Sequence, residues 1–254
     1  MVIYMDSNQL ARAVTKVGMI LLESGAETYR VEDTMTRICK AYGADVVDAY
    51  ATPTMLLISF SIHGDLVHNI KRTSIKSVDL QKIDRINALS RRIVVDQIPI
   101  DDLLVLLEDY DSQPKYRDSM MIAAAGIATF GFGFFFGGSF IDALCAFVLG
   151  ILMKIILIFL NKIEFNPFFT NVIGGAFITL GSYVFKCMGV CDSMDIVIIS
   201  TIMLLVPGLA LTNAIRDSVS GDLVSGLART TEAIFIAIAI ALGSGLMFTL
   251  IGGL

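Results

Sequence analysis

The stretch from Ile202 to Thr231 combines a helix-breaking dipeptide with several polar side chains. Pro207 removes a backbone donor, and Gly208 loosens the chain beside it. In a bilayer, the backbone groups freed by such a break need partners in protein, ions, water or a ligand. Within about four helical turns of the break come Thr212, Asn213, Arg216, Asp217 and Asp222. A broken helix followed by polar groups is typical of a transport site. The alternative is a kink that serves packing only, followed by a solvated loop.

The composition indicates a membrane protein with a polar domain at its front. Of the 254 residues, 55% are hydrophobic and 17% are charged, and the mean hydropathy is +0.74, which is too apolar for a typical soluble domain. Residues 1–118 carry 14 Lys/Arg and 17 Asp/Glu, against 5 and 7 in residues 119–254. We therefore predict a cytoplasmic domain over 1–118 and a membrane domain over 119–254. The net charge of −5 offers no basic face for nucleic acid.

Residues 1–118 carry the patterns of an α+β domain. Apolar residues at helical spacing predict one helix that starts near Ser7 and is interrupted at Gly25, and a second that ends at Gly43. Alternating patterns predict three short strands, at 46–50, 55–60 and 66–70. Two amphipathic helices follow along the chain, so helices should flank a small sheet.

A dense polar motif lies where the first two predicted helices meet. Ser24 and Glu27 have the spacing of a capping box for the second helix. Gly25, Tyr29 and Glu32 complete the motif, and nothing in the sequence explains Tyr29 or Glu32. Gating at the cytoplasmic mouth of the membrane domain is one hypothesis, and scaffolding for assembly is another.

Hydrolysis is a rival interpretation of the same motif. Ser24, Asp33 and His63 could supply a nucleophile and a base, but no nucleophile-elbow pattern or paired catalytic spacing accompanies them. With His63 and His68 as the two histidines, both in the front domain, the ligands of a structural zinc site are too few. We expect no enzyme, no metal and no cofactor.

The second part of the chain is predicted to cross the membrane five times. Each apolar segment is close to the length of about 20 residues that a bilayer requires. The five segments are Ser119–Gly137, Phe140–Leu160, Pro167–Met188, Met194–Asn213 and Leu227–Gly252. Recurring glycines in the first three segments predict close approach between helices. An odd number of spans indicates half of a larger, two-part assembly. The alternative is that the five spans form a homo-oligomer.

The basic residues of the connecting segments predict the orientation. On one side lie Lys115, Arg117, Lys162, Arg216 and Arg229. The other side carries Lys186 alone. We therefore expect the N-terminus in the cytoplasm and the C-terminus outside.

Two long stretches resemble the threonine/serine exporter family. One is Leu21–Gly43 with the following Pro53 and Thr54, and the other is Val206–Gly226, which continues into the last predicted span. Together with a soluble front and five spans, the resemblance covers almost the whole chain. It implies a multi-pass exporter of the bacterial inner membrane.

The resemblance also implies a partner and a class of substrate. Single-chain members carry a second set of spans after this unit, whereas this sequence ends at Leu254 without one. It is therefore similar to the larger subunit of the split members, which pair with a smaller membrane protein. The split members are associated with export of succinate and other dicarboxylates, and the fused members with threonine and serine. The resemblance leaves the choice between these substrates open.

Export of a small carboxylate requires donors in a site of low dielectric constant. Under the family resemblance, Arg216 and Asn213 supply a guanidinium and an amide directly after the Pro207–Gly208 break. Arg216 could instead anchor the end of a span at the interface. Asp217 could pair with Arg216, or could be solvated together with Asp222.

Four further polar residues fall inside or near the ends of the predicted spans. Lys154 lies about two turns from the cytoplasmic end of its span and could bind substrate or snorkel to the interface. Asn171 could contact substrate or join helices. Glu232 and Asp142 could carry a coupled proton if burial raised their pKa, or could simply begin a helix near its dipole.

We therefore predict a subunit of a secondary transporter, because the chain has no GxxxxGK[ST] loop to bind ATP. Its partners would be the smaller membrane subunit, the lipid bilayer and a small carboxylate or amino acid. The alternative is a membrane-anchored sensory or interaction protein whose cytoplasmic domain carries the activity.

Overall fold

The computed structural model describes residues 7–62, 64–73, 78–112 and 116–252, and the chain forms two compact units. The first unit contains Met1–Pro114 and Leu209–Thr230. The second contains Lys115–Gly208 and Thr231–Leu254. The change of composition near Asp118 lies close to the first crossing between units. The composition does not indicate that residues 209–230 return to the first unit.

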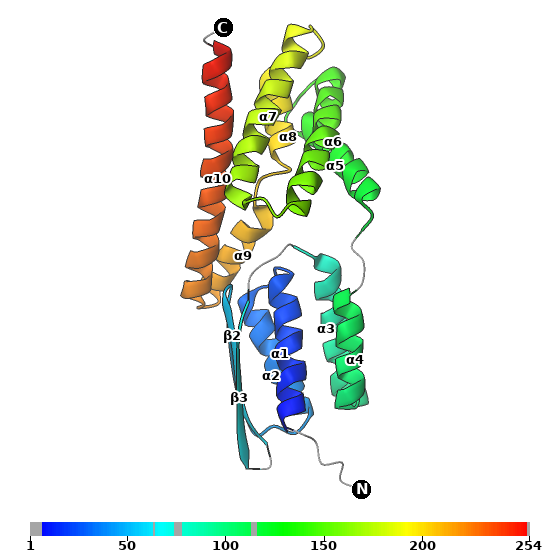
Figure 1. The fold of residues 1–254 in the computed structure, drawn as a ribbon, viewed down its shortest axis with the longest axis vertical. Coiled ribbons are helices and arrows are strands. Elements are labelled where there is room, and N and C mark those ends of the chain that lie inside the picture. Colours follow the sequence, from blue (N-terminus) through cyan, green and yellow to red (C-terminus); the bar gives the residue numbers. More distant parts are fainter. Residues whose placement is uncertain (1–6, 63, 74–77, 113–115, 253–254) are drawn as a thin grey trace. The chain divides into compact units, whose positions relative to one another are not determined.

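The first unit is built in three layers (Figure 1). A three-stranded antiparallel sheet of order β1-β2-β3 forms one layer, α1 and α2 the next, and α3 and α4 the third. The helices are α1 Ser7–Glu23, α2 Thr28–Ala41, α3 Leu80–Asp96 and α4 Ile100–Ser112, and the strands are β1 Val46–Thr52, β2 Met55–Ile62 and β3 Asp65–Arg72. The predicted helices and strands are confirmed within the described residues. His63 lies outside these residues.

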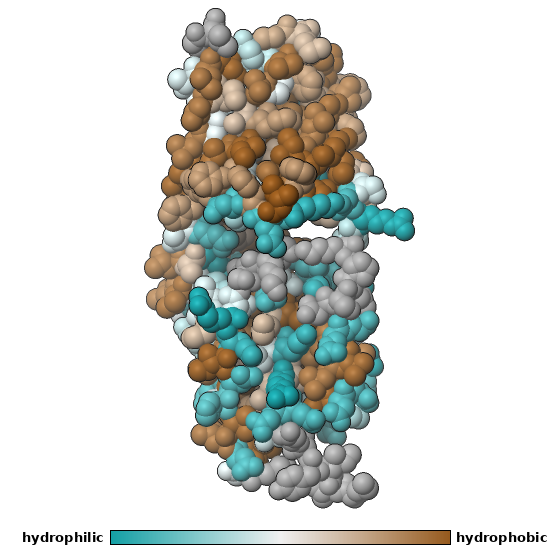
Figure 2. Space-filling view, viewed as in Figure 1, coloured by the Kyte–Doolittle hydropathy of each residue, from teal (hydrophilic) through white to brown (hydrophobic). Residues whose placement is uncertain are grey.

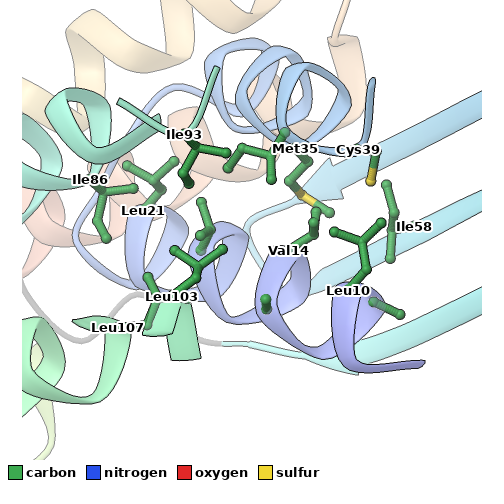
Figure 3. Packing of buried hydrophobic residues seen from close by; sticks show 14 of the residues in the cluster. Leu10, Val14, Leu21, Met35, Cys39, Ile58, Ile86, Ile93, Leu103 and Leu107 are labelled. Atoms are coloured by element: carbon green, nitrogen blue, oxygen red, sulfur yellow. The ribbon is translucent and has the colours of Figure 1, made fainter. Parts of the chain in front are cut away.

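The core of the first unit surrounds α1. Leu10, Val14 and Leu21 of α1 are fully buried, because this helix lies between the sheet and the other helices. In Figure 3 apolar side chains of four neighbouring elements converge on it: Met35, Cys39, Ile58, Ile86, Ile93, Leu103 and Leu107. A helix that is apolar on most of its circumference has to be buried. The layers of the first unit are therefore arranged around this helix.

The junction between α1 and α2 differs from the predicted capping box. The Ser24 N–H donates to the Ile20 carbonyl at 3.1 Å, and Gly25 has φ +83°, so both residues end α1. The residue before α2 is Glu27, and its side chain makes no capping hydrogen bond. The capping-box prediction is wrong because Ser24 and Gly25 are used to terminate the preceding helix.

Four helices of the chain are long and apolar enough to cross a membrane within the described residues: α5 Asp118–Phe135, α6 Phe140–Lys162, α7 Pro167–Cys187 and α10 Leu223–Gly252. Figure 2 shows apolar side chains covering the visible face of the second unit, as lipid contact requires. The predicted close approach at glycines is present. A methyl group added to Gly133 would come within 2.7 Å of the Ala143 Cα, and one at Gly150 within 2.3 Å of the Thr129 Oγ1.

The segment predicted as a fourth continuous span is divided into two short helices. α8 covers Met194–Ile202 and α9 covers Gly208–Val219, with five non-helical residues between them. The predicted break at Pro207 and Gly208 is confirmed, since proline lacks the N–H that would continue the helix and its ring clashes with the preceding turn. The prediction of one spanning helix over Met194–Asn213 is wrong, because α8 has nine residues, too few to cross a bilayer.

Candidate functional site

The structure joins two motifs that lie far apart in the sequence. The polar residues of α9 and of the turn after it lie against the junction of α1 and α2, and both segments belong to the first unit. The sequence indicated a membrane site around Asn213 and Arg216, and a separate cytoplasmic motif around Glu27. In the structure they form one site, which we call the junction site: residues 24–32 together with Asn213, Arg216, Asp217, Asp222 and Arg229.

Asn213 and Arg216 contact consecutive parts of the junction. The buried amide of Asn213 donates from Nδ2 to the Gly25 carbonyl at 2.8 Å. The Arg216 guanidinium pairs with the Glu27 carboxylate, whose second oxygen lies 2.8 Å from the Arg30 Nε. Glu27 therefore lies between two guanidinium groups. Its side chain is 9% exposed, whereas that of Arg216 is 53% exposed.

A fully buried ion pair fixes the centre of the junction site. The side chains of Asp217 and Arg229 are 0% and 2% exposed, and the Asp217 Oδ2 lies 3.0 Å from the Arg229 Nε, without the alignment of a hydrogen bond. The second guanidinium arm donates from Nη2 to the Ala26 carbonyl at 2.6 Å. A charge removed from water needs such partners, because an unpaired buried ion costs several kcal/mol.

Asp217 also supplies the cap that α2 lacks locally. Its Oδ1 accepts a hydrogen bond of 3.1 Å from the Thr28 N–H, which has no partner inside the helix. A carboxylate at this position also interacts favourably with the positive end of the helix dipole. The Thr28 hydroxyl donates to the Asp222 Oδ2 at 3.4 Å. The start of α2 is thus completed by residues that follow Thr28 in the chain by 189 and 194 positions.

Glu32 connects the junction site with the sheet. Its Oε1 accepts a hydrogen bond of 2.8 Å from the Ala51 N–H at the end of β1. Burial raises the pKa of Glu32, and the nearby Asp222 and Asp217 carboxylates add to that rise, while the Ala51 hydrogen bond opposes it. Tyr29 accepts a hydrogen bond of 3.0 Å from the Arg30 Nε, and its ring lies beneath the Arg30 guanidinium. The structure therefore gives partners to Tyr29 and Glu32, which the sequence left unexplained.

Four predicted residues belong to the second unit instead. Lys154 is partly buried on α6, and Glu232 is exposed on α10. Asn171 donates from Nδ2 to the Pro167 carbonyl of its own helix at 2.9 Å. The fourth, Asp142, is 1% exposed and is discussed below. The structure does not bring these residues into the junction site.

The Asp142 carboxylate holds the starts of two helices. Its Oδ2 accepts hydrogen bonds from the Ser139 backbone and hydroxyl, and with the return bond from the Asp142 N–H this forms a capping box at α6. Its Oδ1 accepts two 2.9 Å bonds from the N–H groups of Asp192 and Ser193, directly before α8. The geometry supports the capping alternative, because both oxygens are already used as acceptors.

In the sequence, Arg229 served only as a marker of orientation, although it lies within the first turns of an apolar helix, where a cation requires a partner. That position was the available signal for the Asp217–Arg229 pair. Three of the five basic residues behind the predicted orientation are engaged in ion pairs: Lys162, Arg216 and Arg229. The positions of the N-terminus in the cytoplasm and of the C-terminus outside stay predictions.

Long apolar helices, a spanning pattern interrupted at a proline and an ionic site built across distant motifs define a multi-pass helical membrane protein. The chain belongs to the threonine/serine exporter family: residues 12–251 match the family ThrE, described as "Putative threonine/serine exporter". Both stretches that carried the resemblance in the sequence lie inside this match, and both contribute to the junction site.

Three individual relatives differ in the share of their length that the chain covers. The chain is 24% identical to a "Probable threonine/serine exporter" of Mycobacterium tuberculosis, over 90% of this chain and 44% of that protein. It is 24% identical to a "Threonine/serine exporter" of Corynebacterium glutamicum, over 95% of this chain and 52% of that protein. It therefore spans about half the length of these two relatives. It is 22% identical to a "Probable succinate transporter subunit YjjP" of Klebsiella aerogenes, over 95% of both chains. No solved structure matches the chain.

Proposed function

We propose that this chain is one subunit of a secondary transporter that exports small carboxylates or amino acids across the bacterial inner membrane. Family membership supports the class of protein. The match over nearly the full length of a relative named a succinate transporter subunit supports a two-part assembly. The cargo under this proposal is a succinate-like dicarboxylate, or threonine or serine, and the partner is a smaller membrane subunit.

The observation that carries the proposal is the Arg216–Glu27 ion pair. A guanidinium that binds a carboxylate side chain has the chemistry that a transported carboxylate needs. The buried Asn213 lies one turn before Arg216 on the same helix, directly after the Pro207–Gly208 break. Glu27 thus pairs with the Arg216 guanidinium as a substrate carboxylate would. In transport, the substrate carboxylate replaces the Glu27 carboxylate at Arg216.

The Arg216–Glu27 and Asp217–Arg229 ion pairs should differ in their contribution to stability, and this difference gives them different roles. An ion pair with a half-exposed partner is worth about 0.2–1 kcal/mol, so a ligand can replace Glu27 at small cost. Removal of one partner from a buried pair costs about 3–5 kcal/mol. We infer that Asp217 and Arg229 anchor α9 to the start of α2 throughout the cycle, while Arg216 exchanges its partner.

The remaining parts of the proposal follow the sequence predictions. The first unit lies in the cytoplasm under the predicted orientation, and Lys154 and Asn171 stay candidates for substrate contact. The burial that the predicted proton role requires is missing at Glu232, which is exposed, and both oxygens of Asp142 already accept hydrogen bonds. A secondary mechanism driven by protons stays a prediction from the sequence.

Efflux from liposomes tests the proposal. The chain is reconstituted with and without the small membrane subunit, and loss of labelled succinate, threonine and serine is followed under an imposed proton gradient. We expect efflux of one substrate class with both proteins present, and background efflux for Arg216→Ala. Arg92→Ala is the matched control, because Arg92 forms an exposed 3.7 Å ion pair with Asp96 on α3, away from the junction site. Full efflux by Arg216→Ala would remove this residue from the substrate path.

A further inference from the structure

A cavity of about 300 Å³ lies between α2 and α3 of the first unit and shares Arg30 with the junction site. Six of the residues that line it carry the argument: Arg30, Asp33, Arg37, Asn87, Ser90 and Arg91. Three of these lie on α2 at positions i, i+3 and i+7, and three on α3 at i, i+3 and i+4. Such spacings place side chains on one helix face. Because α2 and α3 pack together, the two polar faces meet at the cavity.

The cavity is basic in a chain that is acidic as a whole. Three guanidinium groups line it against the single carboxylate of Asp33, although the protein carries a net charge of −5. Asp33 pairs with Arg37, and Arg30 pairs with Glu27. Arg91 is exposed and has no ion pair with any residue that the structure describes. The cavity therefore offers positive charge that its own walls do not neutralise.

We propose that this cavity, the arginine pocket, binds a small dianion with carboxylate or phosphate groups. Guanidinium groups bind both kinds of group through paired N–H donors. Arg91 and Arg30, from opposite walls, hold the two ends of the charge, and the Asn87 amide adds a neutral donor. The volume matches the lower end of small-ligand sites, so the ligand has few non-hydrogen atoms.

Occupation of the pocket acts on the junction site through Arg30. This residue lines the pocket and also lies 2.8 Å from the second oxygen of Glu27, whose first oxygen pairs with Arg216. A dianion that draws Arg30 toward the pocket leaves Glu27 with Arg216 as its cation. The ligand thereby changes how readily Arg216 is released to bind substrate. This consequence for transport rests on the proposed function, whereas binding to the pocket does not.

Calorimetric titration of the purified full-length chain tests the binding step. The probes are succinate, inorganic phosphate and, as a monoanion, acetate, at constant ionic strength. All titrations are repeated in Arg216→Ala, so that binding at the junction site is separated from binding at the pocket. We expect a dianion to bind both forms, and Arg91→Gln to weaken it about tenfold or more, because a charge-assisted pair is lost. Arg92→Gln, the neighbouring position outside the pocket, should bind as the parent does.

Comparing the affinities for the three probes identifies the chemical class of the dianion. Tighter binding of succinate assigns a dicarboxylate, and tighter binding of phosphate assigns a phosphoryl compound. Equal affinity for acetate, or unchanged binding in Arg91→Gln, overturns the proposal. Arg91→Lys keeps the charge without the paired donors and should bind with intermediate affinity, which guards against a Gln variant that does not fold.

Efflux measurements then distinguish failure of this inference from failure of the proposed function. If efflux is lost in Arg216→Ala and no form of the chain binds a dianion, the proposed transport function is supported and the proposed arginine pocket is contradicted. If dianion binding depends on Arg91 but the reconstituted pair of subunits shows no efflux, the arginine pocket is supported and the proposed transport function is contradicted.

Discussion

Two buried carboxylates perform the same structural task in the two units, with different partners. Asp142 holds the starts of α6 and α8 through neutral donors, all of them N–H or hydroxyl groups. Asp217 holds the start of α2 through one backbone N–H and the cation of Arg229. We therefore expect the Asp142 carboxylate to keep its neutral donors. Asp217 and Arg229 lie in a group of ions that also contains the Arg216–Glu27 pair, and we expect that neighbouring pair to exchange partners.

The largest effect is expected at the buried ion pair. Arg229→Met leaves Asp217 buried without its cation and should lower the free energy of unfolding by about 3–5 kcal/mol. Asp217→Asn in the same chain removes the orphaned charge, keeps an acceptor for the Thr28 N–H, and should recover much of the loss. Thermal unfolding followed by circular dichroism measures both variants. Equal stability of Arg229→Met and the parent chain would contradict the comparison.

An intermediate effect on stability is expected at Asp142, whose partners are neutral donors. Asp142→Ala leaves the N–H groups before α8 without their acceptor and should cost about 1–3 kcal/mol. No cation partner is recorded for Asp142 among the described residues, so the loss should depend little on salt. Denaturation of the variant at low and high salt checks this expectation. Efflux per folded molecule should stay near that of the parent, and a specific loss of proton coupling would restore Asp142 as a carrier.

A smaller effect on stability is expected for the half-exposed pair. Arg216→Ala should change the free energy of unfolding by less than about 1 kcal/mol, because solvent screens the Arg216–Glu27 interaction. Efflux should nevertheless be lost. Measuring both quantities on one preparation separates binding from folding. A loss of stability as large as that of Arg229→Met would make Arg216 a second anchor.

The smallest effect is expected at Glu32 and depends on pH. Burial raises the pKa of this carboxyl, so the folded chain holds the proton more tightly than the unfolded chain does. Its contribution to stability is complete below the ordinary glutamate pKa of about 4.3 and disappears as pH rises through the raised value. Glu32→Gln should therefore gain stability relative to the parent as pH rises from about 4 to 8. A constant difference in Tm over this range would contradict the raised pKa.

The sequence predicts the elements of this protein better than the contacts between them. Periodicity locates the helices and strands of the first unit, and Pro207 locates the break before α9, because both signals are local. The Asp217–Thr28 contact joins positions far apart in the chain, and no local pattern records such a contact. Ser24 and Glu27 show the limit clearly. Their spacing fits a capping box, but the structure uses Ser24 to end one helix and Glu27 to bind two arginines.

The return of residues 209–230 to the first unit has a consequence for biosynthesis. A nascent chain can form α1, α2 and the sheet soon after they leave the ribosome. The start of α2 then lacks its cap until Asp217 has been translated, after the segments α5 to α8. Completion of the first unit is thus a late event that depends on the membrane segments having been made. A fragment truncated before residue 209 should expose an uncapped α2 and be recognised by proteases.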